Sequence, residues 1–317
     1  KRDLSLGNQT RLTMENPTAI KIENLHKTYG RTQALRGVNL EVKKDEILGF
    51  LGPNGAGKTT TIRCMLDLIH PQAGSINILG FDPQKQPVAV REQVGYLPGE
   101  LYFEANARVK DILHYLAALR GNDINWDYVM ELIQHLELDL DIPVKNLSKE
   151  NKQKLGIVQA LMAKAKILLL DEPTTGLDPL MQHEVHKILK NVRAKGTTIF
   201  FSSHIISEVE AIADRVAIIR KGVIVEDINP TQLSNISMHK IKVRFKKDVD
   251  INPFTKLKGV SLISKRDDMV ITLKVEGEMD RLIKTLAKYP ICNIETINPS
   301  LEEIFLSYYK DEGKKEH

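Results

Sequence analysis

Hydrophobic positions in the first two thirds of the chain form short runs with the spacing of β-strands. Segments 19–25 and 37–42 alternate apolar and polar residues, as strands with one buried face do. Segment 46–52 is almost entirely apolar, and so are 166–171 and 197–202. Such runs are typical of strands buried on both faces, as in parallel sheets.

Helical patterns separate these strands, for example at 59–69 and 180–194. Segment 215–226 predicts two more strands, on either side of Lys221–Gly222. The alternation of strands and helices predicts an α/β fold built around a parallel sheet. Between about 91 and 165 the pattern changes to amphipathic helices, at 109–121 and 127–138, which we interpret as a helical insertion.

A different unit follows segment 227–233, which has the composition of a linker or short turn. Two alternating segments predict strands at 240–247 and 268–275, and two others predict helices at 278–289 and 300–310. The expected division is an N-terminal extension (1–18), an α/β domain (19–230, with its insertion at about 91–165) and a small α+β domain (231–317).

Composition narrows the function classes. The chain has 317 residues, of which 42% are hydrophobic and 27% charged, so it can bury a substantial core. A formal net charge of +4 is too small to indicate nucleic-acid binding. Cys64 and Cys292 have no metal-binding spacing and are interpreted as reduced core thiols. No apolar run approaches the ~18 residues of a membrane span, and residues 1–13 lack the apolar centre of a signal peptide.

One motif points directly to phosphate chemistry. The segment "GPNGAGKT" (52–59) fits G-x-x-x-x-G-K-[ST] between a predicted strand and a predicted helix. Glycine at 55 and 57 lets backbone N–H groups face phosphate oxygens. The lysine would reach the β- and γ-phosphates, and the first threonine would ligate Mg²⁺. The candidate nucleotide-binding residues are Gly52, Pro53, Asn54, Gly55, Ala56, Gly57, Lys58, Thr59 and Thr60.

Two carboxylates end a buried strand, at the edge where open α/β sheets bind ligands. Asp171 suits Mg²⁺, usually through water, and Glu172 suits a general base that polarises an attacking water. His204 ends the next apolar strand, where its side chain could hold the γ-phosphate and this water. For a histidine considered alone, a structural role is the alternative.

The order of the motifs resembles the nucleotide-binding subunit of ABC transporters. After the phosphate loop and the helical insertion come "LSKEN" (147–151), "LLLDEP" (168–173), "GLDP" (176–179) and "SSH" (202–204). The resemblance covers about 19–230. It implies a P-loop NTPase fold with a mixed sheet, an ATPase activity, and ATP with Mg²⁺ as ligands. It also implies that the second domain is the C-terminal accessory domain of this family.

The same resemblance assigns roles to individual residues. Asp171 and Glu172 match the Walker B aspartate and catalytic glutamate, Gly176–Asp178 matches the D-loop, and His204 matches the switch histidine. Tyr29 matches the aromatic residue that stacks on adenine, although a lone tyrosine can also be simply half-buried. Ser148 matches the signature serine, which binds the γ-phosphate held by the partner subunit in a head-to-tail dimer.

The signature itself departs from the family's usual L-S-G-G-Q, because Glu150 stands at the second glycine. A carboxylate beside phosphate adds a like charge, which costs about 4 kcal/mol at ~4 Å and an effective dielectric of 20. Its favourable interaction with the helix dipole contributes only ~0.3–1 kcal/mol. Weakened ATP-driven closure is therefore expected, unless Glu150 turns away to pair with Lys149, Lys152 or Lys154.

A second departure is Gly99, which stands where the family usually has the Q-loop glutamine. Glu100 could take over part of its role, and a plain turn at Pro98–Gly99 is an equal alternative. Segment 298–306, "NPSLEEIFL", resembles ATPases that serve ABC-2-type exporters of drugs or peptides. The resemblance thus implies a cytoplasmic protein on the inner face of the membrane, bound there through a separate permease, in a homodimer or a heterodimer.

Two other functions remain open from the sequence. One is an ATP-binding regulatory or assembly subunit whose hydrolysis is impaired by Glu150. The other is an ABC ATPase that acts on ribosomes or DNA. Ribosome-acting members usually carry two ATPase domains and DNA-acting members long coiled coils, whereas this chain has one set of motifs and no long heptad pattern. No nucleic-acid partner is expected.

Overall fold

The computed structural model describes residues 17–121, 124–229, 238–266, 269–276 and 279–297. The chain divides into two compact units. One contains the chain up to His204 together with Ile219–Val225, and the other contains Ile205–Ile218 together with the chain from Glu226. Residues 1–16 of the expected extension, 230–233 of the expected linker, the expected helix at 300–310 and the segment 298–306 lie outside the described residues.

A six-stranded sheet positions the candidate site. Its strand order is β5-β6-β7-β3-β8-β9, and the strands from β5 to β3 run parallel to their neighbours. Every residue of β3, β6 and β7 is buried, as their apolar sequences predicted. The strands are β3 Ile47–Leu51, β5 Val94–Leu97, β6 Ile167–Asp171, β7 Thr198–Ser203, β8 Arg215–Arg220 and β9 Val223–Ile228.

A second, antiparallel sheet has the order β2-β1-β4. It contains β1 Thr18–Tyr29, β2 Thr32–Lys43 and β4 Ala73–Ile78. The sequence predicted parts of β1 and β2 but not β4 or β5. Strand β5 is only four residues long, which is too short to show a clear hydrophobic period. It also lies inside the range that the sequence predicted to be a helical insertion.

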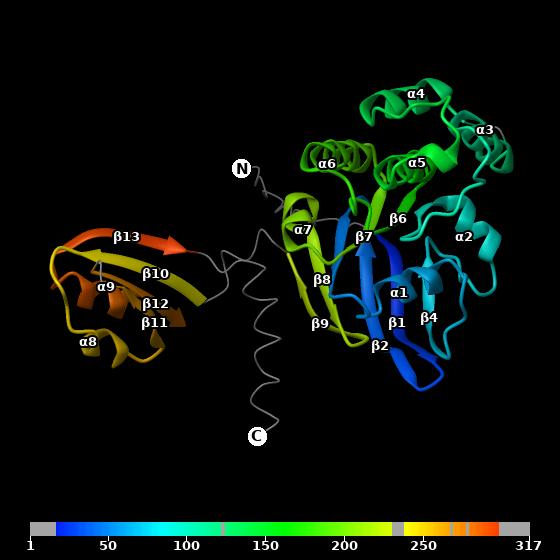
Figure 1. Cartoon of the computed structure of the whole chain (residues 1–317). Coiled ribbons are helices and arrows are strands. Elements are labelled where there is room, and N and C mark those ends of the chain that lie inside the picture. The colour runs from blue at the N-terminus through cyan, green and yellow to red at the C-terminus, as the bar shows by residue number, and fades with distance from the viewer. Residues whose placement is uncertain (1–16, 122–123, 230–237, 267–268, 277–278, 298–317) are drawn as a thin grey trace, which may run out of the picture. The chain divides into compact units, whose positions relative to one another are not determined.

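The helices that accompany these sheets are α1 Lys58–Met65, α2 Pro87–Gln93, α3 Val109–Leu119, α4 Trp126–His135, a 3₁₀ turn at Val144–Asn146, α5 Lys149–Leu161, α6 Pro179–Ala194 and α7 Ile206–Ile212. Figure 1 shows α3 to α6, in green, gathered on one side of the sheet. Helix α1 ends earlier than the predicted 69 because the backbone turns at Asp67, whose φ is 53°. Within the described residues no helix is long and apolar enough to cross a bilayer.

The C-terminal unit contains a four-stranded antiparallel sheet with the order β11-β12-β10-β13. Buried Ile241, Val243 and Phe245 alternate along β10 and pack in a core with Phe254 and Leu282. The period of two therefore places Lys240, Lys242 and Arg244 on the other face. The elements are β10 Met238–Phe245, α8 Asn252–Thr255, β11 Val260–Arg266, β12 Val270–Glu276, α9 Asp280–Leu286 and β13 Ile291–Ile297.

Candidate nucleotide-binding and catalytic site

The backbone of the phosphate loop is fixed by its glycines. Gly57 precedes α1 with φ 114°, and a Cβ there would lie 2.8 Å from the carbonyl oxygen of Ala34. Gly55 also has a positive φ, 78°, but its surroundings are open. No acidic residue and no side-chain cap occupies the first turn of α1, so its N–H groups suit an anion.

Lys58 begins α1 and is almost fully buried, with 5% of its surface exposed. Its Nζ donates hydrogen bonds to the carbonyl oxygens of Gly52 (2.8 Å) and Pro53 (3.2 Å). Burial lowers the pKa of Lys58, although the charges of Glu172 and Asp171 act in the opposite direction. The next two residues, Thr59 and Thr60, are partly buried and follow it into the helix.

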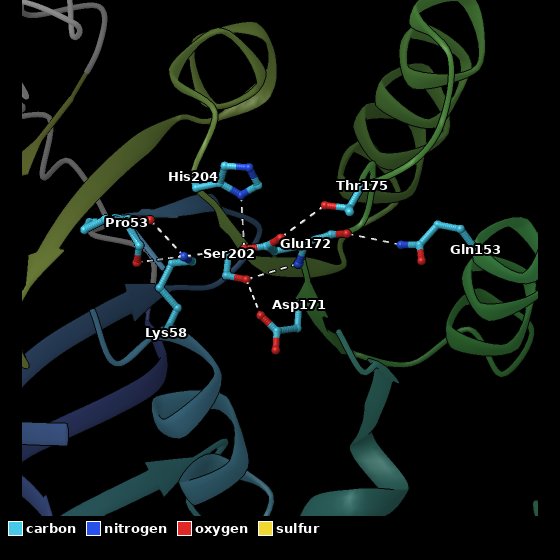
Figure 2. Close-up of polar contacts among 9 residues, drawn as sticks. Pro53, Lys58, Gln153, Asp171, Glu172, Thr175, Ser202 and His204 are labelled. Carbon is cyan, nitrogen blue, oxygen red and sulfur yellow. Dashed lines mark hydrogen bonds and ion pairs between the residues drawn. The ribbon is translucent and has the colours of Figure 1, made fainter. Parts of the chain in front are cut away.

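The carboxylate of Glu172 lies between the phosphate loop and the end of β7 (Figure 2). Its Oε1 is 3.5 Å from the Nζ of Lys58 and 3.2 Å from the Nδ1 of His204. Its other oxygen, Oε2, accepts a hydrogen bond from the Thr175 hydroxyl at 3.1 Å. The structure therefore brings together three side chains that the sequence selected separately: Lys58, Glu172 and His204.

Opposing effects act on the ionisation of Glu172. Burial tends to raise its pKa, but the charges of His204 and Lys58, with hydrogen bonds from His204 and Thr175, outweigh burial. The pKa of Glu172 therefore lies below its usual value. A carboxylate that is ionised near neutral pH can accept a proton, which is the first requirement of a general base.

Asp171 is the last residue of β6 and is 1% exposed. Its Oδ1 accepts a hydrogen bond from the Ser202 hydroxyl at 2.5 Å, whereas its Oδ2 has no partner among the described residues. A buried carboxylate oxygen without a partner is costly and fits a hard cation or its bound water. With the Thr59 hydroxyl, the residues present therefore fit Mg²⁺.

Gly99 lies directly beside this oxygen. A Cβ at Gly99 would stand 3.1 Å from Asp171 Oδ2, so a larger residue there would crowd the carboxylate. Glu100 is directed elsewhere, because its Oε2 accepts a hydrogen bond from the Tyr102 hydroxyl at 3.1 Å. Both of the sequence alternatives for this loop, a substitute for the Q-loop and a plain turn, stay open as predictions.

The start of α5 answers the question raised by Glu150. Ser148 is the N-cap, and its Oγ accepts a hydrogen bond from the Asn151 N–H at 3.1 Å. Glu150 does not remain unpaired, because its Oε1 lies 3.1 Å from Nζ of Lys154, four residues along the same helix. The Lys154 side chain is only 7% exposed. The carboxylate therefore has a fixed counter-charge, one of the alternatives that the sequence left open.

Three other predicted residues occupy separate positions. Tyr29 ends β1, is 46% exposed, and has the Lys27 ammonium 5.2 Å from its ring centroid. Asp178 is the N-cap of α6 and accepts from the Met181 N–H at 2.8 Å. Within the described part of the chain, no hydrogen bond or ion pair links Tyr29, Ser148 or Asp178 to Glu172.

Sequence reasoning missed three polar residues around Glu172. Ser202 binds both Asp171 and the Glu172 N–H, and Thr175 binds the Glu172 carboxylate. Gln153 reaches across from α5 to the backbone of the same loop (Figure 2). The sequence held one weak signal for Gln153. It is a polar residue in the first turns of a helix and is followed by apolar positions, and a polar side chain buried among them needs a hydrogen-bond partner.

Comparison with known proteins identifies the chain. The family described as ABC transporter matches residues 35–175. The bacitracin transport ATP-binding protein BcrA of Bacillus licheniformis is 39% identical over 218 residues, which cover 67% of this chain and 70% of that protein. The chain belongs to the ABC transporter family. It is an ATP-binding ATPase of that family, which confirms the resemblance found in the sequence.

The likeness of this ABC ATPase to known proteins extends beyond the nucleotide-binding region. An uncharacterised ABC transporter ATP-binding protein of Bacillus subtilis, YdbJ, is 31% identical over 310 residues, covering 93% of this chain and 98% of that protein. The solved structure of an ATP-binding subunit of an ABC transporter superposes with a TM-score of 0.64 at 28% identity. It covers 69% of this chain and 92% of that subunit, which confirms the α/β fold of the site.

Proposed function

We propose that this ABC ATPase hydrolyses ATP at the cluster formed by Lys58, Glu172 and His204. The backbone N–H groups of residues 55–60 and the ammonium of Lys58 bind the phosphates. Glu172 accepts the proton of the attacking water, and His204 keeps the Glu172 carboxylate aligned with the γ-phosphate. The observation that carries this proposal is the Glu172 carboxylate, held within 3.5 Å of Lys58 and 3.2 Å of His204.

Mg²⁺ belongs to the same proposal. When bound, the ion neutralises charge on the phosphates and orients them for in-line attack. The Thr59 hydroxyl and the Asp171 carboxylate would hold it, the latter through water. The orphaned Oδ2 of Asp171 supports this assignment, and the Ser202 hydroxyl fixes the carboxylate through Oδ1.

The biological role is proposed from the relatives. The bacitracin transport protein supports the proposal that this chain energises the transport of a drug or peptide. It would do so as a dimer on the cytoplasmic face of a separate permease, with Tyr29 on adenine and with Ser148 and Asp178 at the dimer interface. The division into an ATP-binding domain (19–230) and an accessory domain (231–317) is part of this proposal.

Neither the structure nor the comparisons support the alternative of a subunit with impaired hydrolysis. That hypothesis rested on an uncompensated charge at Glu150, and Lys154 provides the counter-charge. We therefore propose an active ATPase rather than a regulatory subunit.

The direct test is steady-state Mg-ATP hydrolysis by the purified protein and its Glu172→Gln variant. Loss of a general base should lower the rate about 10²–10⁴-fold. Binding of a fluorescent ATP analogue should stay within threefold, because glutamine keeps the size of the side chain. Lys58→Met is the complementary variant and should weaken binding itself. Equal hydrolysis by the wild type and Glu172→Gln would show that Glu172 is not the base.

A further inference from the structure

Gln153 makes an unusual pair of contacts for a helical side chain. It lies on α5, is 8% exposed, and uses one amide nitrogen for two backbone acceptors. Its Nε2 donates to the carbonyl oxygen of Glu172 at 3.1 Å and to that of Pro173 at 2.9 Å. Both protons of the amide group are thus satisfied. These two hydrogen bonds stabilise the buried amide, because burying it without partners would cost free energy.

The two acceptors belong to a strained part of the backbone. Glu172 has φ 53°, in the left-handed region, which is unfavourable for a residue with a side chain. It also precedes Pro173, and a residue before proline normally prefers an extended conformation. Such a conformation persists only when the surroundings hold it.

The bonds that hold this peptide come from three directions. On one side the Glu172 N–H donates to the carbonyl oxygen of Ser202 at 3.2 Å and to its hydroxyl at 3.1 Å. On the carbonyl side, the Thr175 N–H donates within the same turn at 3.2 Å. Gln153 is the donor that comes from α5, so it links the helix capped by Ser148 to the backbone of Glu172.

A second contact joins the same two segments. The aliphatic part of Lys149 lies beside Gly176, since a Cβ on that glycine would stand 3.6 Å from Lys149 Cε. Helix α5 therefore touches the segment from Glu172 to Gly176 at two points. Of these two contacts, only the Gln153 amide makes directed hydrogen bonds, so it is the contact through which α5 can orient the peptide.

We propose that Gln153 is a positioning residue for Glu172. By donating to the carbonyls of residues 172 and 173, it keeps the Glu172 peptide left-handed and its carboxylate aimed at Lys58 and His204. The position of α5 is thereby tied to the placement of the proton acceptor. This inference rests on the proposed function of Glu172 as the general base.

The test compares Gln153→Met with a matched control, Gln182→Met. Methionine keeps the length of glutamine but removes both donors. In the control, Gln182 Nε2 also donates to a backbone carbonyl, that of Leu177 at 3.1 Å, but not to the Glu172 loop. We expect Gln153→Met to lower kcat 10–100-fold, as misplacement of a catalytic group does, while KM and nucleotide affinity change less than threefold. Gln182→Met should change kcat less than twofold.

A double variant separates positioning from a general structural role. In a Glu172→Gln background the carboxylate is already gone, so Gln153→Met should lower the residual rate less than twofold. An equal loss in both backgrounds would overturn the inference, because Gln153 would then act independently of the carboxylate. Unchanged kcat in Gln153→Met alone would also overturn it.

Rates are expressed per nucleotide-binding site, so that loss of folded protein is not counted as loss of catalysis. Gln153→Lys provides a rescue, because an ammonium can donate to both carbonyls, and its kcat should exceed that of Gln153→Met at least threefold.

Failure of this rescue together with equal thermal destabilisation by both variants would indicate packing rather than positioning. If Glu172→Gln itself hydrolyses ATP at the wild-type rate, the proposed base is wrong and the inference falls with it. If Glu172→Gln is inactive while Gln153→Met is fully active, the base stands and only the role of Gln153 is wrong.

Discussion

The phosphate loop before α1 and the start of α5 are both helix N-termini that we assign to phosphate binding, but they are built differently. At α1 the first turn has no acidic residue and no side-chain cap, and glycine backbone sets the geometry. At α5 the cap is the Ser148 side chain, and an acidic residue, Glu150, lies in the first turn. There a lysine of the same helix, Lys154, holds the carboxylate at 3.1 Å.

This difference shows how much change each kind of site tolerates. At Gly57 the positive φ and the nearby backbone exclude any residue with a side chain, because a Cβ would collide with the carbonyl oxygen of Ala34. A geometry built from side chains can absorb a foreign charge when a partner lies one helical turn away. The departure from L-S-G-G-Q at Glu150 is therefore compensated locally, whereas no departure occurs in the phosphate loop.

The largest effect is expected from Gly57→Ala. The new Cβ would lie 2.8 Å from the Ala34 carbonyl oxygen, at a φ of 114° that alanine rarely adopts. We expect nucleotide binding to fall below detection and the protein to lose about 1–3 kcal/mol of stability. Gly55→Ala is the control, because its φ is also positive, 78°, but nothing lies within 4 Å of the new atom. Equal binding by both variants would show that steric contact does not shape the loop.

Next in size is the effect of Lys154→Met, which removes the counter-charge but keeps a long side chain in a buried position. Glu150 would then present an unpaired carboxylate near the N-terminus of α5. We expect ATP hydrolysis to fall about 10-fold, equivalent to about 1.4 kcal/mol of repulsion. The double variant Glu150→Gln/Lys154→Met should recover most of the rate, and Glu150→Gly alone should stay within threefold of wild type. No recovery in the double variant would mean that Lys154 matters for packing only.

A smaller effect is expected from the helix caps. Ser148→Ala and Asp178→Ala each remove a side-chain acceptor from a helix N-terminus, so each should cost about 1 kcal/mol in denaturant unfolding. If Ser148 also binds phosphate across a dimer, its variant should lower ATP hydrolysis far more than this stability loss explains. A purely structural cap would lower the rate only in proportion to the loss of folded protein.

The smallest effect concerns pH. Burial tends to raise the pKa of Glu172, and the charge of His204 is the largest influence that lowers it. His204→Gln should therefore raise that pKa, which a carbon-13 titration of the glutamate carboxyl can follow. Because the folded pKa lies below the ordinary 4.5, the stability that Glu172 contributes is present above about pH 4.5 and is lost as the pH falls through the folded value. A pKa unchanged in the variant would contradict the assigned cause.

The sequence by itself determined the strands that are buried on both faces, the phosphate loop and the carboxylate pair. These features are local: a run of apolar residues, a fixed spacing of glycines and a lysine, and two acids at a strand end. The importance of Gly57 could be predicted because the motif places a glycine where backbone N–H groups must face phosphate, and the structure adds its positive φ of 114°. Short elements such as β4 and β5 could not, because they are too brief to show a period.

Only the tertiary structure decided which side chains meet around Glu172. Lys58 comes from α1, Gln153 from α5, and Ser202 and His204 from the end of β7. Their convergence on Glu172 depends on strand order and on where α5 lies against β6. The direction of Glu150 was likewise open in the sequence, since three lysines were within reach and the rotamers of a helix surface are not fixed by spacing alone. Burial of Lys154 selected it, because an ammonium removed from water gains most from a carboxylate partner.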